Sequence, residues 1–428
     1  MIGFTNKKVV IIGAQRSGQA AARLAFQLGA QVFISENAPK EKIHSEFKKW
    51  VADNRIVVEY GGHSRNIIEK SDLVVLSPGV FKDALPVKWA KAKNISVISE
   101  VELAYQACPC PIIAVTGSNG KTTVATLIKE LMEQSGKNVC LCGNIGSAFS
   151  QYVLGLKEKD YVILEVSSFQ LETIDQFKPR IAVFLNFSQN HLDRHKDLEE
   201  YFEAKKKIFS NQDQNDYAVL NASDDWVRGC AEALKAQVFY FNSPKDLETQ
   251  KYRNPNFLAA YKVAEILGID KNICQEVFDN FTGVEHRLEW VRSFNGVDFI
   301  NDSKATTAEA SRWALTNISQ PVVWICGGRE KNIDFSVLKD LVKEKVRKII
   351  AIGEAKEKIA DIFRPVGEVE KCGTLEEAVK NAYQFAQKGD CVLLSPMCAS
   401  FDMFKDFEQR GKIYKELVFH LNKNQVHS

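Results

Sequence analysis

A glycine-rich loop in the first third of the chain constrains its fold more than any other feature. The sequence Thr-Gly-Ser-Asn-Gly-Lys-Thr-Thr occupies residues 116–123 and follows the apolar run Ile112–Val115. A helix-like stretch comes next and ends at about Ser135, with Gly136 as its stop. A buried strand, a glycine-rich loop and a helix in this order are typical of a phosphate-binding loop. The sequence therefore predicts an α/β domain that binds a nucleotide through its phosphates.

Each residue type in this loop has a physical task. Gly117 and Gly120 would let the backbone turn its N–H groups inward, where the helix N-terminus adds partial positive charge. Lys121 would reach the β- and γ-phosphates, and the Thr122 hydroxyl would bind Mg²⁺. The usual loop has a glycine where this chain has Val115, so a plain turn with a solvated lysine is the alternative. The predicted ATP-binding residues of the loop are Gly117, Ser118, Asn119, Gly120, Lys121, Thr122 and Thr123.

Strand-like and helix-like segments alternate on both sides of the loop, which indicates βαβ units and parallel sheets. We predict three α/β domains in series: a Rossmann-like domain at 1–105, a central phosphate-loop domain at 106–283 and a second Rossmann-like domain at 284–428. A proline-containing linker at 107–111 separates the first two. The expected strands include Lys8–Ile12, Gln31–Ser35, Asp72–Leu76, Tyr161–Leu164, Ile181–Leu185, Ala218–Leu220, Val322–Ile325, Lys348–Ile352 and Cys391–Leu394.

Composition narrows the classes of partner. The 56 basic and 54 acidic residues give a net charge of +2, so no bulk electrostatic attraction to nucleic acid or to an anionic membrane is expected. The ten cysteines lack zinc-finger spacing, which favours reduced thiols in a cytosolic protein. About eighteen apolar residues nowhere follow one another in the sequence, so no membrane span is expected. The apolar run after the first lysines is too short for a signal sequence.

The first strand is followed by a second glycine pattern, Gly13-x4-Gly18. Gln15 stands where a dinucleotide fingerprint would have its second glycine. A nucleotide site and a ligand-free turn with close strand-to-helix packing both stay open. Glu36, at the end of the second strand, could accept a hydrogen bond from ribose or uracil, or could be a solvated carboxylate.

Polar residues follow two strands of the central region. Glu165 ends the strand Tyr161–Leu164, where a hard oxygen ligand suits Mg²⁺ bound to phosphates. Ser167 follows where a helix begins and could act as its cap. His191 and His195 come after another strand with zinc-like spacing, but no third ligand is evident nearby. We favour a functional role for His191 only.

Lys205 begins a run of three lysines on a helix-like segment, and by itself such a run is usually a solvated face. In the last region, three strand ends carry polar clusters, at 301–307, 327–331 and 395–402. Arg287 and Lys304 could stabilise charge on a transferring phosphoryl group. Three such clusters in one domain predict a shared site for an anionic ligand.

Several of these segments occur in the order seen in the Mur ligases of bacterial peptidoglycan synthesis, which the chain resembles over essentially its whole length. The segments are 116–123, 165–170, 190–195, 204–208, 286–287, 301–306 and 394–400. The resemblance implies a UDP-binding domain, a central ATPase domain and a C-terminal domain that closes over ATP. Asn-Asp-Ser-Lys-Ala-Thr at 301–306 and Ser-Pro-x-Cys-Ala-Ser at 395–400 are similar to the D-glutamate-adding member of the family.

The resemblance implies a cytoplasmic, monomeric amide ligase that uses ATP and Mg²⁺ to join D-glutamate to UDP-N-acetylmuramoyl-L-alanine. The catalytic residues would be Lys121, Glu165, His191, Lys205 and Arg287. The Mg²⁺ ligands would be Thr122, Glu165, His191 and a carbamylated Lys205. ATP would also be contacted by Asn256, Arg287 and Asp302. The UDP substrate would be bound by Ser17, Glu36, Asn37, Asn144, Ser167 and Gln170. D-glutamate would be bound by Lys304, Thr306, Lys331, Ser400 and Phe407.

The chain departs from the family pattern at three places. Gln15 replaces a glycine, Glu36 stands where aspartate is commoner, and 252–256 is shorter than the family's His-Asn-x-x-Asn pattern. The third departure includes Asn256, which the resemblance places on the adenine side of ATP. The alternatives are another amide ligase similar to folylpolyglutamate synthase, a regulatory ATP-binding protein with a phosphate loop, and a nicotinamide dehydrogenase. The motif at 301–306 argues against a ligase similar to folylpolyglutamate synthase. The broken glycine fingerprint argues against a nicotinamide dehydrogenase.

Overall fold

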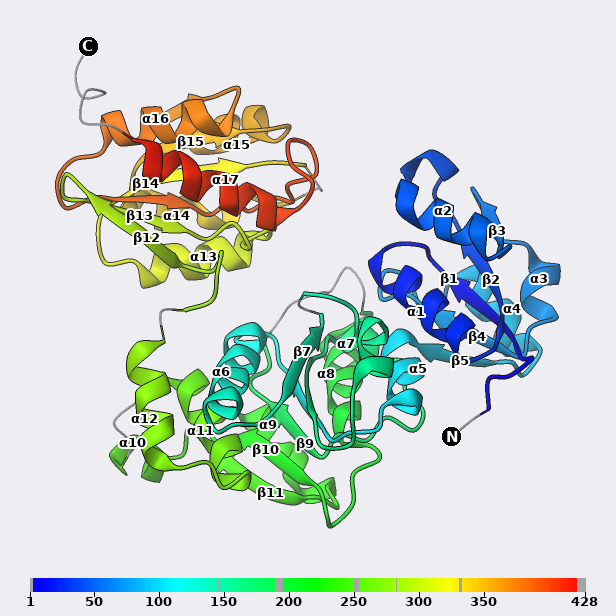
Figure 1. Ribbon diagram of the computed structural model, residues 1–428. Helices are drawn as coiled ribbons and strands as arrows, with labels where there is room; N and C mark the ends of the chain where they lie inside the picture. The colour runs from blue at the N-terminus through cyan, green and yellow to red at the C-terminus, as the bar shows by residue number, and fades with distance from the viewer. Residues whose placement is uncertain are drawn as a thin grey trace. The chain divides into compact units, whose positions relative to one another are not determined.

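The computed structural model describes residues 3–144, 146–188, 195–249, 254–281, 283–330 and 333–421. It divides into two compact units, Met1–Phe281 and Thr282–Ser428, which are described separately (Figure 1). The first unit contains two sheets and the second contains one. The predicted three-domain division, with boundaries after residues 105 and 283, stays a prediction. Within the described ranges, no helix is both long and apolar enough to cross a lipid bilayer.

The first sheet is parallel, with strand order β3-β2-β1-β4-β5. Its strands are β1 (Lys8–Ile12), β2 (Gln31–Glu36), β3 (Val57–Tyr60), β4 (Leu73–Leu76) and β5 (Ser96–Ser99). Its helices are α1 (Arg16–Gln27), α2 (Ser45–Asp53), α3 (Arg65–Glu69), α4 (Leu85–Ala92) and α5 (Glu100–Ala107). Alternate residues of β1 enter the cores on opposite faces, Val9 with Leu24 of α1 and Val10 with Val87 of α4. The order reverses between β1 and β4, so a ligand crevice is expected at their carboxyl ends.

The second sheet is also parallel, with strand order β11-β10-β9-β6-β8-β7. Its strands are β6 (Ile112–Thr116), β7 (Val139–Gly143), β8 (Tyr161–Glu165), β9 (Ile181–Phe184), β10 (Tyr217–Asn221) and β11 (Gln237–Phe241). Its helices are α6 (Lys121–Gln134), α7 (Ser168–Leu171), α8 (Leu198–Lys206), α9 (Asp225–Gly229), α10 (Pro244–Thr249), α11 (Pro255–Ile266) and α12 (Lys271–Asn280). One face packs on α6, α11 and α12, so the carboxyl ends of its central strands stay free for a site.

A buried carboxylate joins the two sheets of the first unit. Glu102, on α5, accepts hydrogen bonds from the backbone N–H groups of Asp175 (2.9 Å), Gln176 (3.1 Å) and Phe177 (2.9 Å). Its side chain is fully buried, so these three donors replace the water that a carboxylate would otherwise need. The contact fixes the loop before β9 against α5, and one apolar core runs through both sheets.

The second unit has one mixed sheet with strand order β12-β13-β17-β14-β15-β16, in which only the β12–β13 pair is antiparallel among the described pairs. Its strands are β12 (Glu289–Phe294), β13 (Val297–Asn301), β14 (Val322–Gly327), β15 (Val346–Ile352), β16 (Val369–Lys371) and β17 (Cys391–Leu394). Helices α13 (Ala308–Asn317), α14 (Lys339–Lys345) and α15 (Lys356–Phe363) contribute to the core on one face. Helices α16 (Leu375–Phe385) and α17 (Phe407–His420) cover the other.

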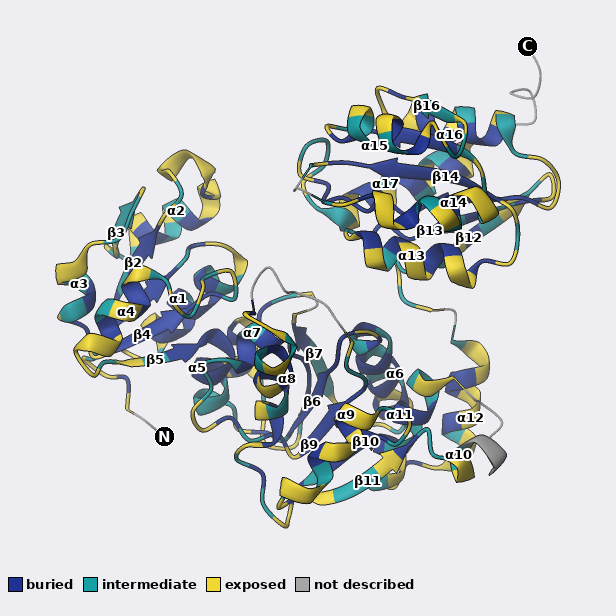
Figure 2. Cartoon of the chain, turned by 180° about the vertical axis from the view of Figure 1, so that it is seen from behind, coloured by how far each residue is buried: buried dark blue, intermediate teal, exposed yellow. Residues whose placement is uncertain are grey.

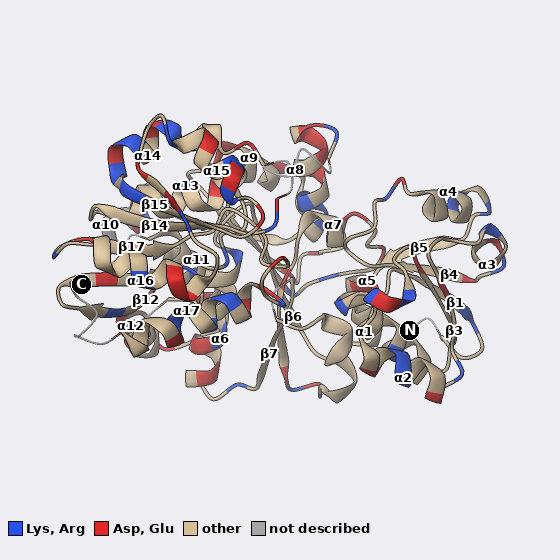
Figure 3. Ribbon diagram, turned by 90° about the horizontal axis from the view of Figure 1, so that it is seen from above, with Lys and Arg blue, Asp and Glu red and all other residues tan. Residues whose placement is uncertain are grey.

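The central strands of both units are buried between layers of helices, whose outer faces are exposed (Figure 2). Acidic and basic side chains are interspersed over the helices (Figure 3). The predicted α/β class with parallel sheets is confirmed. The expected strands form, two of them with the predicted ends and the others with ends that differ by one or two residues, because hydrogen bonding to neighbouring strands sets where each strand ends.

Candidate active site

The phosphate loop lies between β6 and α6, as predicted. Gly120 directly precedes α6 with a φ of 83°, a left-handed conformation that favours glycine. The Nζ atom of Lys121 donates to the carbonyl oxygens of Gly117 (2.9 Å) and Ser118 (3.1 Å), so the ammonium lies over the loop itself. Thr122 and Thr123 are in the first turn of α6. The loop therefore presents one cation and two hydroxyls at a helix N-terminus.

Glu165 lies beside this loop because β8, which it ends, pairs directly with β6. Its carboxylate accepts from Thr122 Oγ1 (2.8 Å) and from Asn144 Nδ2 (2.8 Å). A hydroxyl and a carboxylate next to a phosphate loop are the hard oxygen donors that Mg²⁺ prefers, so these residues fit the predicted metal. Within the described residues, no group of three or more histidine, cysteine or acidic side chains forms a complete metal cage. His191 lies outside the described residues.

Lys205 lies at this site and not on a solvated face. Its side chain, on α8, is 2% exposed, and its Nζ donates to the carbonyl oxygen of Gly117 at 2.9 Å. The nitrogen is also 4.7 Å from the ring centre of Tyr201. Burial holds the pKa of the Lys205 amine well below its usual value, helped by Lys121 and opposed by Glu165. The structure thus places Lys205 with the phosphate-loop residues, although 88 positions separate it from Gly117.

Two asparagines outside the loop support it. Asn186, just after β9, accepts from the Ser118 N–H (3.0 Å) with its backbone and from the Asn119 N–H (2.9 Å) with its side chain. Asn186 was not among the predicted site residues, and its place after a strand that pairs with β6 was the available signal. Asn256, at the start of α11, lies so close to Gly120 that a Cβ there would collide with the Asn256 amide oxygen. This contact puts Asn256 beside the loop, where the adenine-side role was predicted.

A pocket of ≈ 450 Å³ opens at the carboxyl ends of β1, β2 and β4 and extends to the end of β7. Of the six predicted UDP-substrate residues, five line it: Ser17, Glu36, Asn37, Asn144 and Gln170. Ser167 does not, because it caps α7, and its hydroxyl and backbone N–H both bond to Gln170 (3.0 Å each). Among these five residues, Ser17 and Gln170 are 153 positions apart in the sequence.

The Glu36 carboxylate has structural partners as well as a place in this pocket. It accepts hydrogen bonds from the backbone N–H groups of Ala14 and Ala38, the latter at 2.7 Å. Each carboxylate oxygen thus fixes one of the loops that follow β1 and β2. The reading of Glu36 as a solvated carboxylate is wrong, since its side chain is buried. Gly18 lies so close to the carbonyl of Gly13 that a Cβ on Gly18 would not fit. Close packing therefore accounts for Gly18 in the Gly13-x4-Gly18 pattern.

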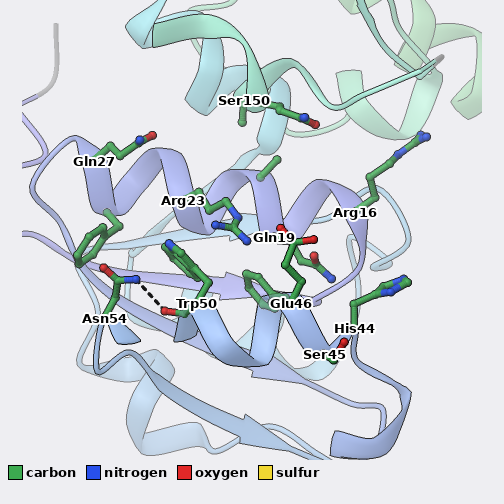
Figure 4. A pocket seen from close by; sticks show the side chains of 14 residues that line it. Arg16, Gln19, Arg23, Gln27, His44, Ser45, Glu46, Trp50, Asn54 and Ser150 are labelled. Carbon is green, nitrogen blue, oxygen red and sulfur yellow. Dashed lines mark hydrogen bonds between the residues drawn. The ribbon is translucent and has the colours of Figure 1, made fainter. Parts of the chain in front are cut away.

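A larger hollow of ≈ 780 Å³ lies between α1 and α2 (Figure 4). Arg23 lies over the ring of Trp50, 4.7 Å from its centre, and Asn54 Nδ2 donates to the Trp50 carbonyl at 2.8 Å. None of the described residues that line it is a predicted site residue. Size alone would favour this hollow, but the smaller pocket contains five predicted site residues and adjoins Glu165 through Asn144.

In the second unit, the three predicted strand ends meet at one edge of the sheet because β17 pairs with both β13 and β14. Asp302, directly after β13, accepts from Ser395 Oγ (2.8 Å) and from the Leu288 N–H (3.2 Å). Burial raises the pKa of Asp302 to about 7, opposed by these two donors and by nearby Arg287. Arg287 and Asp302, both predicted to contact ATP, are thus brought together.

Three of the five predicted D-glutamate residues lie near the same edge: Lys304, Ser400 and Phe407. Lys304 Nζ is 5.8 Å from the ring centre of Phe407, and Ser400 is buried in the loop after β17. Arg410 on α17, which the sequence analysis did not single out, is 1% exposed and donates to the carbonyl oxygens of Ser303 (2.8 Å) and Cys398 (3.2 Å). It thereby holds two strand-end loops together. Thr306 is partly exposed and lies two residues after Lys304 in the chain. Lys331 lies outside the described residues.

Comparison with known proteins identifies the class. The family of the Mur ligase middle domain matches residues 115–272, and that of the Mur ligase, glutamate ligase domain matches residues 286–398. A solved structure of UDP-N-acetylmuramate-alanine ligase from Thermotoga maritima is similar over 97% of this chain and 99% of its own, with a TM-score of 0.59 and 17% identity. That likeness concerns the fold alone. The chain belongs to the Mur ligase family, so the resemblance predicted from its motifs is confirmed.

Curated relatives narrow the class further. The chain is 38% identical over 450 residues to the UDP-N-acetylmuramoylalanine--D-glutamate ligase of Thermoanaerobacter pseudethanolicus, covering 97% of this chain and 99% of that protein. It is also 38% identical over 462 residues to the enzyme of the same name from Chloroherpeton thalassium, covering 97% and 98%. The similarity therefore extends over the full length of both relatives and includes the first sheet, which lies outside the two family matches.

Proposed function

We propose that this chain is an ATP-dependent ligase that joins D-glutamate to UDP-N-acetylmuramoyl-L-alanine. The observation that carries the proposal is the convergence of Lys121, Thr122, Glu165 and Lys205 on one phosphate loop, at the end of a pocket lined by the predicted UDP-substrate residues. The names and full-length similarity of the relatives support the same activity. We further propose that the enzyme acts in the cytoplasm as a monomer.

The reaction needs activation because a carboxylate is a poor electrophile. The terminal carboxylate of the UDP substrate would take the γ-phosphoryl group of ATP, giving an acyl phosphate and ADP. The amine of D-glutamate would then attack the acyl carbon, form the amide and release phosphate. Lys121 would hold the γ-phosphate and offset its charge during transfer. Arg287 is the second predicted cation for this charge.

Asn144 would orient the substrate, since its amide bonds to Glu165 at 2.8 Å and lines the UDP-substrate pocket. When bound, Mg²⁺ would supply positive charge that polarises the phosphoryl oxygens. Thr122 and Glu165 would hold it, with Lys205 as a ligand after carbamylation and His191 as the predicted fourth. Burial lowers the pKa of Lys205, which favours loss of the ammonium proton that carbamylation requires.

A phosphate-release assay over a panel of amino acids tests this function. We expect phosphate only when ATP, the UDP-muramoyl substrate and D-glutamate are all present. L-glutamate, L-alanine and a diamino acid should give background rates. Equal rates with a diamino acid, or none with D-glutamate, would reject the assignment. Phosphate release that ignores the UDP substrate would favour the folylpolyglutamate-synthase-like or regulatory alternatives.

A further inference from the structure

Two Cys-x-Cys segments lie in the apolar core that the two sheets of the first unit share. Cys108 and Cys110 are in the linker after α5, and Cys140 and Cys142 are on β7. All ten cysteines lie in the described ranges, and Cys108 and Cys140 are the two that are not buried. A small oxidant from the solvent therefore reaches these two sulfurs before the others.

The two accessible sulfurs differ in reactivity, because the thiolate is the reactive form of cysteine. A hydrogen bond from Cys142 lowers the pKa of Cys140, opposed by burial and by Asp160. Burial raises the pKa of Cys108, and it raises the pKa of Cys110 to about 12. The sulfurs of Cys108 and Cys110 are 3.7 Å apart, but both thiols stay protonated at neutral pH. Cys140 is therefore the cysteine that an oxidant attacks first.

The strand places a second thiol within bonding reach of Cys140. Alternate residues of a strand face the same side of the sheet, and Cys140 and Cys142 pair with Val162 and Leu164 of β8. At about 3.3 Å per strand residue, their Cα atoms are about 6.6 Å apart, near the upper end of the roughly 4.4–6.8 Å that a disulfide spans. A bond between the two sulfurs therefore requires β7 to shorten.

Shortening of β7 would reach the active site directly. Among the described strands β7 pairs with β8 only, so it can bend without breaking a second ladder of hydrogen bonds. Gly143, its last residue, packs so closely on Glu165 that a Cβ there would collide with the Glu165 carbonyl oxygen. Asn144 donates to Glu165 twice, from its N–H to the carbonyl (2.8 Å) and from Nδ2 to the carboxylate (2.8 Å). A shorter β7 would withdraw Asn144 from Glu165 and from the UDP-substrate pocket.

We propose that Cys140 and Cys142 form a reversible disulfide that switches the active site off when hydrogen peroxide oxidises the chain. The Cys140 thiolate attacks one peroxide oxygen, breaks the O–O bond and becomes a sulfenic acid, and the released hydroxide takes up a proton to give water. The Cys142 sulfur then attacks the Cys140 sulfur, the S–O bond breaks, and the oxygen leaves as water with the Cys142 proton. Together the two sulfurs lose two electrons, which reduce the peroxide to two waters.

A disulfide of this kind suits a switch. Disulfides in cytosolic proteins are usually transient and redox-sensing, and a bond that requires a strand to bend is readily reduced by a dithiol. The effect on ligase activity rests on the proposed function, whereas formation of the disulfide does not.

Treatment of the full chain with hydrogen peroxide, followed by alkylation of free thiols, trypsin digestion and mass spectrometry, identifies the bond. Cys140 and Cys142 are in one tryptic peptide, residues 138–157, and Cys108 and Cys110 are in another, residues 94–121. We expect an internal disulfide in the first peptide, and alkylation of both its cysteines when dithiothreitol is added beforehand. A disulfide confined to the second peptide, or one that joins the two peptides, would overturn the assigned pair.

Phosphate release by the treated chain measures the switch. The oxidised wild type should lose activity by about tenfold or more, the scale of one hydrogen bond to a charged group, and dithiothreitol should restore it. Cys140→Ser should keep its activity in peroxide. Cys108→Ser, which removes the other accessible thiol, is the matched control and should stay sensitive. Cys142→Ala should hold Cys140 as a sulfenic acid that dimedone labels.

The thermal unfolding midpoint of each variant reports whether the fold is intact, and Cys142→Ala carries the comparison if Cys140→Ser is unfolded. Full activity in a chain that carries the disulfide would overturn the switch, and so would equal losses in the wild type and Cys140→Ser. A reduced wild-type chain without ligase activity would instead overturn the proposed function and leave the mapped disulfide standing.

Discussion

The amine nitrogen of Lys205 and the backbone carbonyl of Gly117 are joined by a hydrogen bond of 2.9 Å. Lys121 donates to the same carbonyl at 2.9 Å, so two lysine nitrogens meet at one oxygen beside Glu165. Two ammonium groups at this spacing would repel each other and would repel Mg²⁺. Converting Lys205 to a carbamate removes one positive charge and supplies oxygen ligands.

We predict that Lys205→Ala lowers turnover at least about a hundredfold, the scale seen when one charged group is removed from a catalytic site. Acetate or another small carboxylic acid in the buffer should restore part of the activity, because it can occupy the space of the missing carbamate. Steady-state rates with and without added acid provide the measurement.

The neighbouring lysines are the matched controls. Lys206 pairs with Glu203 at 3.0 Å on the surface, and Lys207 donates to the Glu172 carbonyl at 2.6 Å. Lys206→Ala and Lys207→Ala should therefore have mild effects and no response to acetate. Wild-type activity in Lys205→Ala, or rescue confined to a neighbour, would show that the carbamylated position is assigned wrongly.

Lys121→Ala should lower turnover by about a thousandfold, because Lys121 is the cation that the loop directs at the transferring phosphoryl group. The unfolding midpoint should hardly change, since its described hydrogen bonds are to two loop carbonyls. Single-turnover phosphate release at saturating ATP is the measurement. Near-normal turnover would remove the loop from the mechanism.

Gly120→Ala and Gly136→Ala separate backbone strain from a collision at the site. Both glycines have left-handed φ values, 83° and 78°, so each substitution should cost about 1 kcal/mol of stability. Only at Gly120 would the new Cβ strike the amide of Asn256, whereas Gly136 has open space. ATP titration should show weaker binding in Gly120→Ala alone, and equal ATP affinities would contradict the contact.

The pH dependence of stability should carry a contribution from Asp302. Its pKa of about 7 in the folded chain exceeds the ordinary value of 3.8, so the folded state holds this proton more tightly than the unfolded state. The stability that Asp302 contributes is therefore greatest at low pH and falls as the pH rises towards 7, by at most about 1.4 kcal/mol per pH unit.

Asp302→Asn should remove this slope while keeping a side chain of the same shape. Urea unfolding of wild type and variant at pH 5, 6, 7 and 8 gives the difference in unfolding free energy. We expect the wild type to lose stability relative to the variant up to about pH 7 and then to level off. A difference that is constant over the whole range would show that Asp302 is not held protonated.

The sequence by itself determined the parts of the molecule that depend on contiguous residues. The phosphate loop at 116–123 forms as predicted because its glycines, its strand and its helix are neighbours in the chain, and local backbone geometry decides their conformation. Glu165 was predicted for a related reason, since it directly follows an apolar run that forms a strand, and ligands gather at the carboxyl ends of such strands. The role of Asp302 was implied by the family resemblance.

Only the tertiary structure decided which distant residues meet. Three adjacent lysines are alike in sequence, and the packing of α8 buries Lys205 while leaving Lys206 and Lys207 outside. Asn144 contacts Glu165 because β7, which ends just before Asn144, pairs with β8. Such contacts are set by strand pairing and helix packing between segments far apart in the chain, and no local pattern of residue types encodes them.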